Sequence, residues 1–464
     1  MELQNKFNYR YIFGISLVSA MGGLLFGYDW VVIGGAKPFY EKFFEIADLP
    51  RLQGWAMSCA LTGCLLGAIL SGFLSDRYGR KRLLILAAFL FILSALGTGA
   101  SNHFNSFVIF RILGGIGIGL ASNLSPMYIA EVTPARFRGG FVSINQLTIV
   151  IGILAAQIVN WLIAEPVPET ANAADILQSW NGQSGWRWMF WAELVPASLF
   201  FTLMWFVPES PRWLATRNKY DRVLSILKRL GGKEYAEREI VEIENSLKAN
   251  TGGVSFKALF SGGMSKVLII GIVLAAFQQW CGINIIFNYA EEIFSAAGYG
   301  VSDILFNIVV TGSVNLVFTF VAIYTVDKIG RKALMMIGSA GLAGIYAVMG
   351  AFYYFEFHGL PVLIVVLLAI ACYAMSIAPI TWVVLSEIFP NRVRGAALAV
   401  ATVSLWAASF ILVYTFPFLN KALGASGSFW IFGLVCVAGF IFIRSRLIET
   451  KQKSLETIEK ELIG

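Results

Sequence analysis

An acidic residue stands inside a long apolar segment near the start of the chain. Asp29 follows Phe26-Gly27-Tyr28 in a stretch of hydrophobic residues. A charged side chain at the centre of a membrane-spanning helix costs at least about 2.5 to 3.5 kcal/mol, so it needs a reason. Burial disfavours an ionised carboxylate and a neighbouring cation favours it, so an acid whose surroundings alternate between wet and dry can bind and release a proton. Asp29 therefore predicts proton coupling; a static buried ion pair, or an acid near the outer membrane interface, is the alternative.

Two more charged residues fall in apolar segments. Arg111 stands near the start of segment 107–130, and Glu193 lies in segment 187–208. Ionisable side chains within a membrane generally pair with one another and face the protein interior. We expect Arg111 to pair with Asp29 and Glu193 to join them, although a purely structural role for Glu193 is equally open.

Amide side chains cluster in a later apolar segment. Gln278 and Gln279 are adjacent, and Asn284 follows shortly after Gly282, which can loosen the helix and let Asn284 turn inward. A sugar presents hydroxyl groups and an apolar face, so its site needs amides, which both donate and accept, and aromatic planes. The cluster predicts a sugar site; interhelical hydrogen bonding is the alternative for any one of these residues.

No feature of the sequence indicates a metal, a cofactor or an enzyme. The cysteines all fall inside apolar segments, and no Cys or His cluster has ligand spacing, so we expect neither a disulfide nor a metal site. There is no G-x-x-x-x-G-K-[ST] loop, which argues against an ATP-driven pump. The cysteines are Cys59, Cys64, Cys281, Cys372 and Cys436.

The elements that must position these residues are membrane helices. Hydrophobic residues make up 57% of the 464 residues and charged residues only 14%. About 20 apolar residues cross a bilayer core as a helix. The sequence predicts an all-α membrane protein with twelve spans. They are expected near 10–34, 53–75, 82–101, 107–130, 140–164, 187–208, 266–294, 303–326, 332–356, 361–387, 393–418 and 426–446.

The charge distribution predicts the topology. The net charge of +7 comes from basic residues at alternate loops and not from one folded face, so it does not indicate nucleic acid. Eleven Lys and Arg lie in the connections after the second, fourth, eighth and tenth spans, and four in the loops of the opposite side. The positive-inside rule then places both termini in the cytoplasm of a cell (inner or plasma) membrane protein. Those four are Lys37, Lys42, Arg51 and Lys421.

The first span is expected to be a retained helix, because no small-residue cleavage site followed by a soluble domain accompanies it; a cleaved leader is the alternative.

Two charged signatures occur twice. The pattern D-[RK]-x-G-R-K covers 76–81 and 327–332, and E-x-x-P-x-R-x-R-G covers 131–139 and 387–395. The offsets are 251 and 256 residues, which predicts two related six-helix halves. Ordinary positive-inside loops would explain the charge but not the shared Gly, Pro and acid. The predicted organisation is a first half over 1–209, a cytoplasmic helical linker over 210–265, a second half over 266–446 and a cytoplasmic tail over 447–464.

The repeated acids and arginines suggest a gate. Pairs at the helix ends could form a network that locks the halves together on the cytoplasmic side and breaks when they rock apart. One exposed pair would be too weak for this.

These signatures, with Pro208-Glu-Ser-Pro211-Arg212 and Gln278 to Asn284, resemble the sugar porter family of the major facilitator superfamily over essentially the whole chain. Bacterial xylose-type sugar:proton symporters are the most similar group, on Leu124-Ser-Pro-Met-Tyr-Ile-Ala130 and Ser386-Glu-Ile-Phe-Pro390. The family's C-terminal P-E-T-K-G is degraded here to Ile448-Glu-Thr-Lys-Gln452. The resemblance implies the gate residues Arg80, Glu131, Arg138, Glu209, Arg212, Arg331, Glu387 and Arg394.

The resemblance also implies a sugar site and symport. It maps Gln278, Gln279 and Asn284 onto sugar-contacting positions; core or lipid-facing packing remains an alternative for the aromatic residues among the others. This chain departs from the xylose-type carriers at Ile153 and Leu405, where amides are expected, and related facilitative glucose carriers have Asn at the position of Asp29. The further expected contacts are Phe26, Gln157, which matches the glucose facilitators, Tyr289, Asn315, Trp382 and Trp406.

The sequence therefore predicts a proton-coupled monosaccharide symporter for a pentose or hexose that works by alternating access. Its expected partners are the sugar, the proton and the lipid bilayer, and we expect it to function as a monomer. A facilitative uniporter is the main alternative. A sugar sensor is disfavoured because only about eighteen residues follow Arg446, and a drug exporter is disfavoured by the amide cluster.

Overall fold

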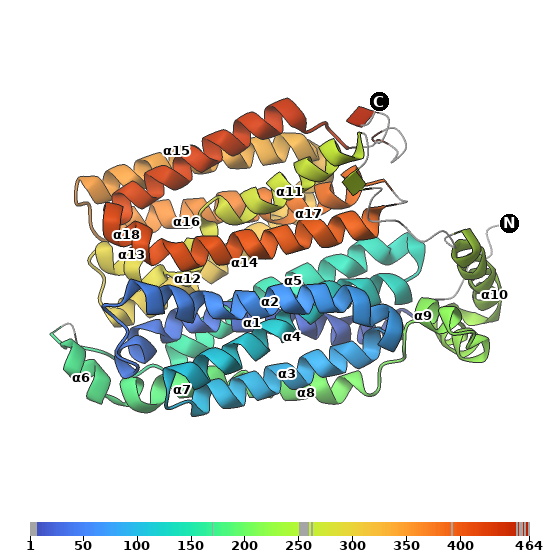
Figure 1. Cartoon of the computed structure of the whole chain (residues 1–464), viewed down its shortest axis with the longest axis horizontal. Coiled ribbons are helices and arrows are strands. Elements are labelled where there is room, and N and C mark those ends of the chain that lie inside the picture. Colours follow the sequence, from blue (N-terminus) through green and yellow to red (C-terminus); the bar gives the residue numbers. More distant parts are fainter. Residues whose placement is uncertain are drawn as a thin grey trace.

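The computed structural model describes residues 7–168, 170–249, 259–260, 263–390, 393–451, 453, 458 and 461–462, apart from the side chains of 136, 246–249 and 327. Over these residues the regular elements are helices, and they form two bundles that lie side by side (Figure 1). The first bundle is coloured blue to green and the second yellow to red. Both termini lie at one end of the molecule, the N-terminus beside α10 and the C-terminus at the end of the second bundle.

The first bundle contains the helices that carry Asp29, Arg111 and Glu193, and it is followed by two helices outside the bundle. Its long helices are α1 (Tyr9–Phe43), α2 (Pro50–Tyr78), α3 (Arg80–Ala100), α4 (Phe104–Val132) and α5 (Arg138–Ile163). Shorter pieces follow in α6 (Ala173–Gln178), η2 (Asn181–Gly185), α7 (Trp186–Trp191) and α8 (Leu194–Met204), and then α9 (Pro211–Thr216) and α10 (Tyr220–Ala249).

The second bundle carries the amide cluster. Its helices are α11 (Met264–Trp280), α12 (Ile283–Asn288), α13 (Ala290–Ala296), α14 (Val301–Ile329), α15 (Arg331–Tyr354), α16 (Leu360–Ala374), α17 (Ile377–Ile388) and α18 (Arg394–Arg446).

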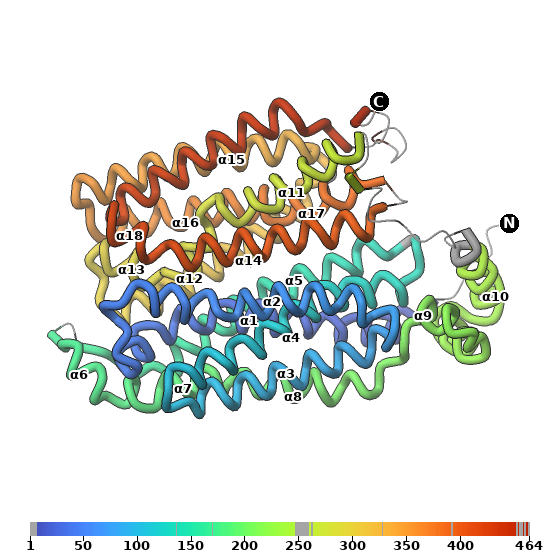
Figure 2. The backbone as a smooth tube through the Cα atoms, viewed as in Figure 1, coloured from blue at the N-terminus to red at the C-terminus, as the bar shows by residue number. Residues whose placement is uncertain are grey.

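Ten helices of the described chain are long and apolar enough to cross a membrane. One of them, α18, has 53 residues and doubles back at Gly424, whose φ of 66° allows the sharp turn, so it supplies two crossings (Figure 2). The short helices α7 and α8 together form the predicted sixth crossing. Twelve crossings therefore agree with the prediction. The first boundary was wrong, however, because α1 continues to Phe43 and includes Lys37, which had been expected in a loop.

Two helix breaks in the second bundle meet each other. Gly282 has φ +90° and separates α11 from α12, a conformation that favours glycine. The chain also breaks at Ser376, between α16 and α17. Gln278, just before the first break, donates from Nε2 to the Ala378 carbonyl oxygen just after the second, at 3.0 Å. This hydrogen bond satisfies a backbone carbonyl group freed by the second break, as backbone inside a membrane requires.

Small residues bring α2 and α4 into close contact, and this suggests a test of the packing. A Cβ on Gly63 would run into the Ile112 carbonyl oxygen and lie 2.9 Å from the Gly115 Cα, whereas one on Gly72 of the same helix would meet nothing within 4 Å. Gly63→Val should therefore destabilise the fold by about 1 to 3 kcal/mol through overpacking. We expect a lower yield of folded protein and an earlier thermal transition. Gly72→Val is the matched control, and equal behaviour of the two variants would contradict the packing argument.

Candidate functional site

Asp29 and Arg111 meet in the centre of the first bundle. Both are buried, with 0% and 2% of their surface exposed. Arg111 Nη1 forms a close ion pair with Asp29 Oδ1, and Nη2 donates to the Asp29 backbone carbonyl oxygen at 3.2 Å. The structure thus links α1 to α4 through the charges that the sequence singled out. Gly114 leaves room for this pair, since a Cβ there would lie 2.9 Å from Asp29 Oδ2.

Glu193 lies at the turn between α7 and α8 and is 1% exposed. The structure gives it no ion pair within 4.0 Å among the described residues, so it borders the Asp29–Arg111 pair and does not join it directly. Phe190, three residues earlier, has its ring centroid 5.6 Å from the Arg111 guanidinium carbon. Within the described part of the chain, Asp29 Oδ2, Arg111 Nε and Glu193 Oε1 are buried without a hydrogen-bond partner. The two carboxylate oxygens can therefore accept a proton, and the guanidinium can donate a further hydrogen bond.

The predicted amides are buried. Asn284 Nδ2 forms a close hydrogen bond with Gln279 Oε1 across the Gly282 break, and Gln278 is tied to Ala378. Gln157, on α5 of the first bundle, is 2% exposed and reaches the second bundle, because a Cβ on Gly312 of α14 would collide with its Oε1. Gln157 Oε1 and Gln278 Oε1 have no hydrogen-bond partner among the described residues and are free acceptors. Asn315, also on α14, is 6% exposed.

The predicted aromatic contacts divide into two kinds. The ring centroids of Phe26 and Trp406 lie 5.8 Å apart between the bundles. The ring of Trp30 completes a triangle, with its centroid 6.0 Å from that of Phe26 and 5.8 Å from that of Trp406. The Trp406 indole N–H is buried without a partner in the described chain, so it is a free donor. Sequence reasoning missed Trp30, although its spacing of four residues from Phe26 places both on one helix face.

Tyr289 and Trp382 have different surroundings from that triangle. Tyr289 is fully buried; its hydroxyl donates to the Val413 carbonyl oxygen at 2.7 Å and its ring lies 4.6 Å from Phe416. In this conformation Tyr289 packs between α12 and α18. Trp382 lies on α17, six residues after the Ser376 break, and is 39% exposed.

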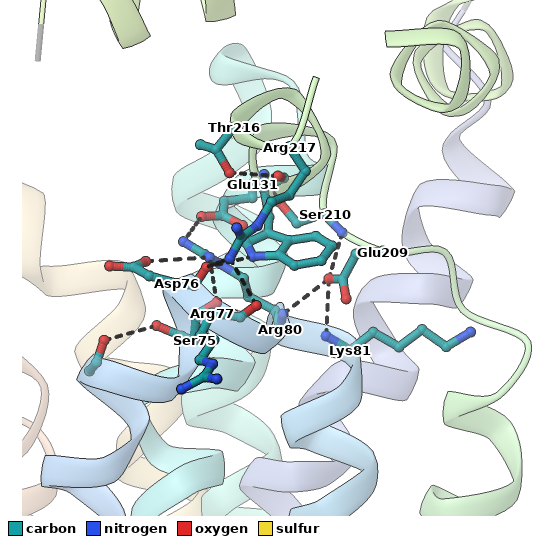
Figure 3. Close-up of polar contacts among 12 residues, drawn as sticks. Ser75, Asp76, Arg77, Arg80, Lys81, Glu131, Glu209, Ser210, Thr216 and Arg217 are labelled. Carbon is teal, nitrogen blue, oxygen red and sulfur yellow. Dashed lines mark hydrogen bonds and ion pairs between the residues drawn. The ribbon is translucent and has the colours of Figure 1, made fainter. Parts of the chain in front are cut away.

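A polar network surrounds the first signature at the end of the molecule that holds the termini (Figure 3). Arg80 Nη2 lies 3.0 Å from Glu131 Oε1, and Arg80 Nη1 lies 3.7 Å from Asp76 Oδ1. Glu209 Oε1 accepts from the backbone N–H groups of Arg80, Lys81 and Ser210 at 3.0, 3.1 and 2.9 Å. The carboxylate of Glu209 thus caps the start of α3, where Gly79 turns with φ +90°.

The second bundle repeats this arrangement. Arg331 Nη2 lies 3.2 Å from Glu387 Oε1, and Gly330 turns with φ +105°. Glu449 accepts from the backbone N–H groups of Arg331 and Lys332 at 2.9 and 3.1 Å, as Glu209 does at α3. Sequence comparison had treated the segment around Glu449 as a degraded signature, but the carboxylate that caps the helix is retained.

The ion pairs of both signatures form within a bundle. Arg80–Glu131 joins α3 to α4, and Arg331–Glu387 joins α15 to α17, so these described pairs differ from the lock between halves that the sequence suggested. Arg138 donates to the Ala130 carbonyl oxygen at 2.9 Å and Arg394 to that of Phe389 at 3.2 Å, again locally. Arg212 is exposed. The side chains of Arg136 and Asp327, and all of Arg392, lie outside the described residues.

The two capping carboxylates differ in their electrostatics. Burial raises the pKa of Glu209 above its ordinary value, although three backbone N–H donors act to lower it. Burial also acts to raise the pKa of Glu449, but backbone N–H donors, including those of Lys451 and Arg331, outweigh it and hold that pKa below its ordinary value. Stability from a lowered carboxylate pKa is present above the ordinary value and is lost as the pH falls through the lowered one; a raised pKa has the opposite sign.

This difference predicts unequal effects of two matched substitutions. Glutamine resembles the protonated acid, which the fold favours at Glu209 and disfavours at Glu449. Near neutral pH we therefore expect Glu449→Gln to lower the thermal unfolding midpoint of the purified protein more than Glu209→Gln does. Glu237→Gln, on the exposed face of α10, is the control and should change little. A larger loss at Glu209 would show that the assignment of the two caps is wrong.

Comparisons with known proteins agree with this geometry. Residues 15–462 match the family described as "Sugar (and other) transporter". The chain is 40% identical to the D-xylose-proton symporter of Escherichia coli, covering 98% of this chain and 97% of that one, and 39% identical to the arabinose-proton symporter of Bacillus subtilis, covering 96% and 94%. The inward-open structure of the E. coli xylose transporter matches with a TM-score of 0.84 and 38% identity over 97% of this chain and all of that one. The chain is a twelve-helix carrier of the major facilitator fold and belongs to the sugar transporter family.

Proposed function

We propose that this protein is a proton-coupled monosaccharide symporter that works by alternating access. The observation that carries the proposal is the buried Asp29–Arg111 pair, whose spare acceptor and donor atoms sit in a carrier that also holds buried, unsatisfied amides. Similar proteins are named xylose-proton and arabinose-proton symporters, which supports a pentose as cargo, and another is named a glucose transport protein, which supports a hexose. The positive-inside rule supports a cell membrane location with both termini in the cytoplasm, and function as a monomer completes the proposal.

The proton acts at Asp29. While Asp29 is ionised it holds the Arg111 guanidinium and so ties α1 to α4. Protonation removes the negative charge and weakens this tie, which leaves Arg111 able to turn toward another acceptor. Glu193, buried nearby with an unpartnered oxygen, is the natural acceptor. The proton therefore changes how α1 sits in its bundle.

The sugar binds where the bundles face each other. Gln157 from the first bundle and Gln278, Gln279, Asn284 and Asn315 from the second supply amides for its hydroxyl groups. Phe26 and Trp406 offer rings to its apolar face, and Trp382, partly exposed on α17, offers a third.

Phe26 lies one helical turn from Asp29, so the sugar site and the proton site share α1. Movement of α1 couples the two.

The two cytoplasmic networks support a rocking motion. Each binds its own bundle together, so each bundle can move as a unit while the contacts between the bundles change. Similarity to an inward-open transporter and the absence, among the described pairs, of an ion pair between the two signatures support an inward-facing state. The gate residues would then join the halves only when the cytoplasmic side closes.

Uptake into sealed vesicles tests the proposal against its rival, a facilitative uniporter. Labelled xylose, glucose, galactose and arabinose would be offered with and without an imposed pH gradient, acid outside. A symporter should concentrate at least one of these sugars only when the gradient is present. Equal final levels with and without the gradient would support the uniporter.

A further inference from the structure

A buried lysine near the end of α1 holds three carboxylates. Lys37 is 1% exposed, and its Nζ lies 3.1 Å from Glu41 Oε2, 3.0 Å from Glu291 Oε2 and 2.6 Å from Glu292 Oε1. Glu41 belongs to α1, whereas Glu291 and Glu292 begin α13. This cluster of four residues, the Lys37 cluster, therefore ties the first bundle to the second.

The Lys37 cluster lies at the end opposite the termini. The helix α1 starts beside the N-terminus and reaches Lys37 in its last two turns, and α12 and α13 lie at that far end (Figure 1). Under the proposed topology this end faces outward. While the signatures at the cytoplasmic end pair only within bundles, this cluster closes the outer end across them.

Neighbouring helices fix the cluster in place. Gln53 Nε2 of α2 donates to Glu41 Oε2 at 3.0 Å. The Tyr289 ring lies 5.9 Å from Lys37 Nζ, and the Tyr289 hydroxyl is held by Val413 of α18. The side chains of Glu41, Glu291 and Glu292 keep only 6%, 23% and 25% of their exposure.

The charges of the Lys37 cluster do not balance. Its three carboxylate oxygens all lie within 3.1 Å of one nitrogen and hence within about 6 Å of one another, where like charges oppose joint ionisation. One ammonium against three carboxylates leaves two excess negative charges in a site that is mostly buried. Lys42, in the next turn, donates to the Pro38 carbonyl oxygen at 2.9 Å and can offset at most one of them.

Two further titratable groups near the cluster supply no positive charge. Tyr40 donates its hydroxyl to Met57 Sδ, and the acid in the first turn of α14, which packs against α13, is Asp303 and adds no positive charge. Within the described chain, Glu41 Oε1 and Glu292 Oε2 are buried without a hydrogen-bond partner. A carboxyl oxygen that is buried and unpartnered beside excess negative charge is a place for a proton.

We propose that the Lys37 cluster is a second proton-binding site, which takes one proton from the outer solution as the outer entrance closes. In the closed state the proton converts one carboxylate to the neutral acid and halves the excess charge. When the bundles separate, Glu291 and Glu292 leave Lys37 and regain water, and the proton returns to the same side. The site adds nothing to the transported charge but makes closure depend on external pH, with acid favouring the closed state.

Distances between two spin labels measure how closure of the outer end depends on pH, and the measurement needs no sugar transport. Labels at Leu49→Cys and Leu423→Cys, both exposed and placed before α2 and at the turn of α18, report the width of the outer end. The background variant Asp29→Asn in lipid nanodiscs removes the central acid. The measured quantity is the ratio of the population with the closed distance to the population with the open distance. We expect this ratio to rise on acidification by up to about tenfold per pH unit, which is the limit for one proton.

Matched variants assign the response to the cluster. Glu292→Gln and Glu41→Gln each remove one charge permanently, so each should hold the closed distance and abolish the pH response. Glu45 is an exposed acid in the connection between α1 and α2, and Glu45→Gln should keep the pH response. Lys37→Met, which leaves three carboxylates without their counter-ion, should favour the open distance throughout. A parent without a pH response, an unchanged response in both Gln variants, or a Lys37→Met variant as closed as the parent would overturn the proposal.

Failure of the proposed second proton site is distinguishable from failure of the proposed symport. A uniporter would fail to concentrate sugar in the vesicle assay yet could still show the pH-dependent distance, whereas a symporter without this site would concentrate sugar and show no difference among the cluster variants.

Discussion

Asp29→Asn should abolish uphill sugar uptake while leaving sugar exchange intact. Asparagine keeps the size and the acceptor oxygen but cannot bind the proton, so the pH gradient no longer drives accumulation. One pH unit stores about 1.4 kcal/mol per proton, enough for about tenfold accumulation. The variant should show none of this, while counterflow of labelled against unlabelled sugar continues, because the amides of the second bundle are unchanged.

The control for this substitution is Asp175→Asn, an exposed acid on α6 that should leave accumulation unaffected. If Asp29→Asn still concentrated sugar, the coupling proton would have to act elsewhere. If it lost exchange as well as accumulation, the Asp29–Arg111 pair would have a structural role that the proposal does not assign to it.

Gln278→Leu should have the second largest effect, on sugar affinity. The substitution keeps a similar volume but removes a free acceptor and the donor to the Ala378 carbonyl oxygen. In the complex, the sugar hydroxyl that donates to Gln278 would then be buried without an acceptor. Leaving one buried polar group unsatisfied costs about 1 to 3 kcal/mol, which corresponds to a loss of affinity of about 5- to 150-fold. Equilibrium binding of the preferred sugar to purified protein, by calorimetry, measures this change without any transport.

Gln183→Leu serves as its control, because Gln183 is an exposed amide that also donates to a backbone carbonyl oxygen, that of Leu177, at 2.8 Å. Its affinity for sugar should be that of the parent. An unchanged affinity in Gln278→Leu would remove this residue from the sugar site and make it an interhelical link between the two breaks.

Hydropathy predicted the crossings well because each is a local property of about 20 residues. The sequence predicts that the first span ends at 34, because Lys37 and Glu41 interrupt the apolar run. The Lys37 ammonium pairs with Glu291 and Glu292, which lie more than 250 residues away in sequence, and Glu41 pairs with Lys37. A local hydropathy window contains no information about such partners, so it ends the predicted span before the last turns of the helix.

The site was predictable where residue type dictates chemistry. Asp29 and Arg111 are opposite charges in apolar segments, so they are expected to pair. The structure confirms that the two side chains form an ion pair. Glu449 was undervalued because the motif around it is lost, although capping two N–H groups requires only a carboxylate at the right place. The signature charges pair within each bundle in this structure, whereas the charge pattern of the sequence is the same for pairing within and between bundles.

Proton movement that accompanies sugar entry tests the central claim most directly. Lightly buffered proteoliposomes without an imposed gradient would receive sugar on the outside while the external pH is recorded. Symport predicts that the external solution becomes alkaline on addition of a transported sugar, and that Asp29→Asn gives no such change. Entry of labelled sugar without any alkalinisation in the unmodified protein would contradict the account.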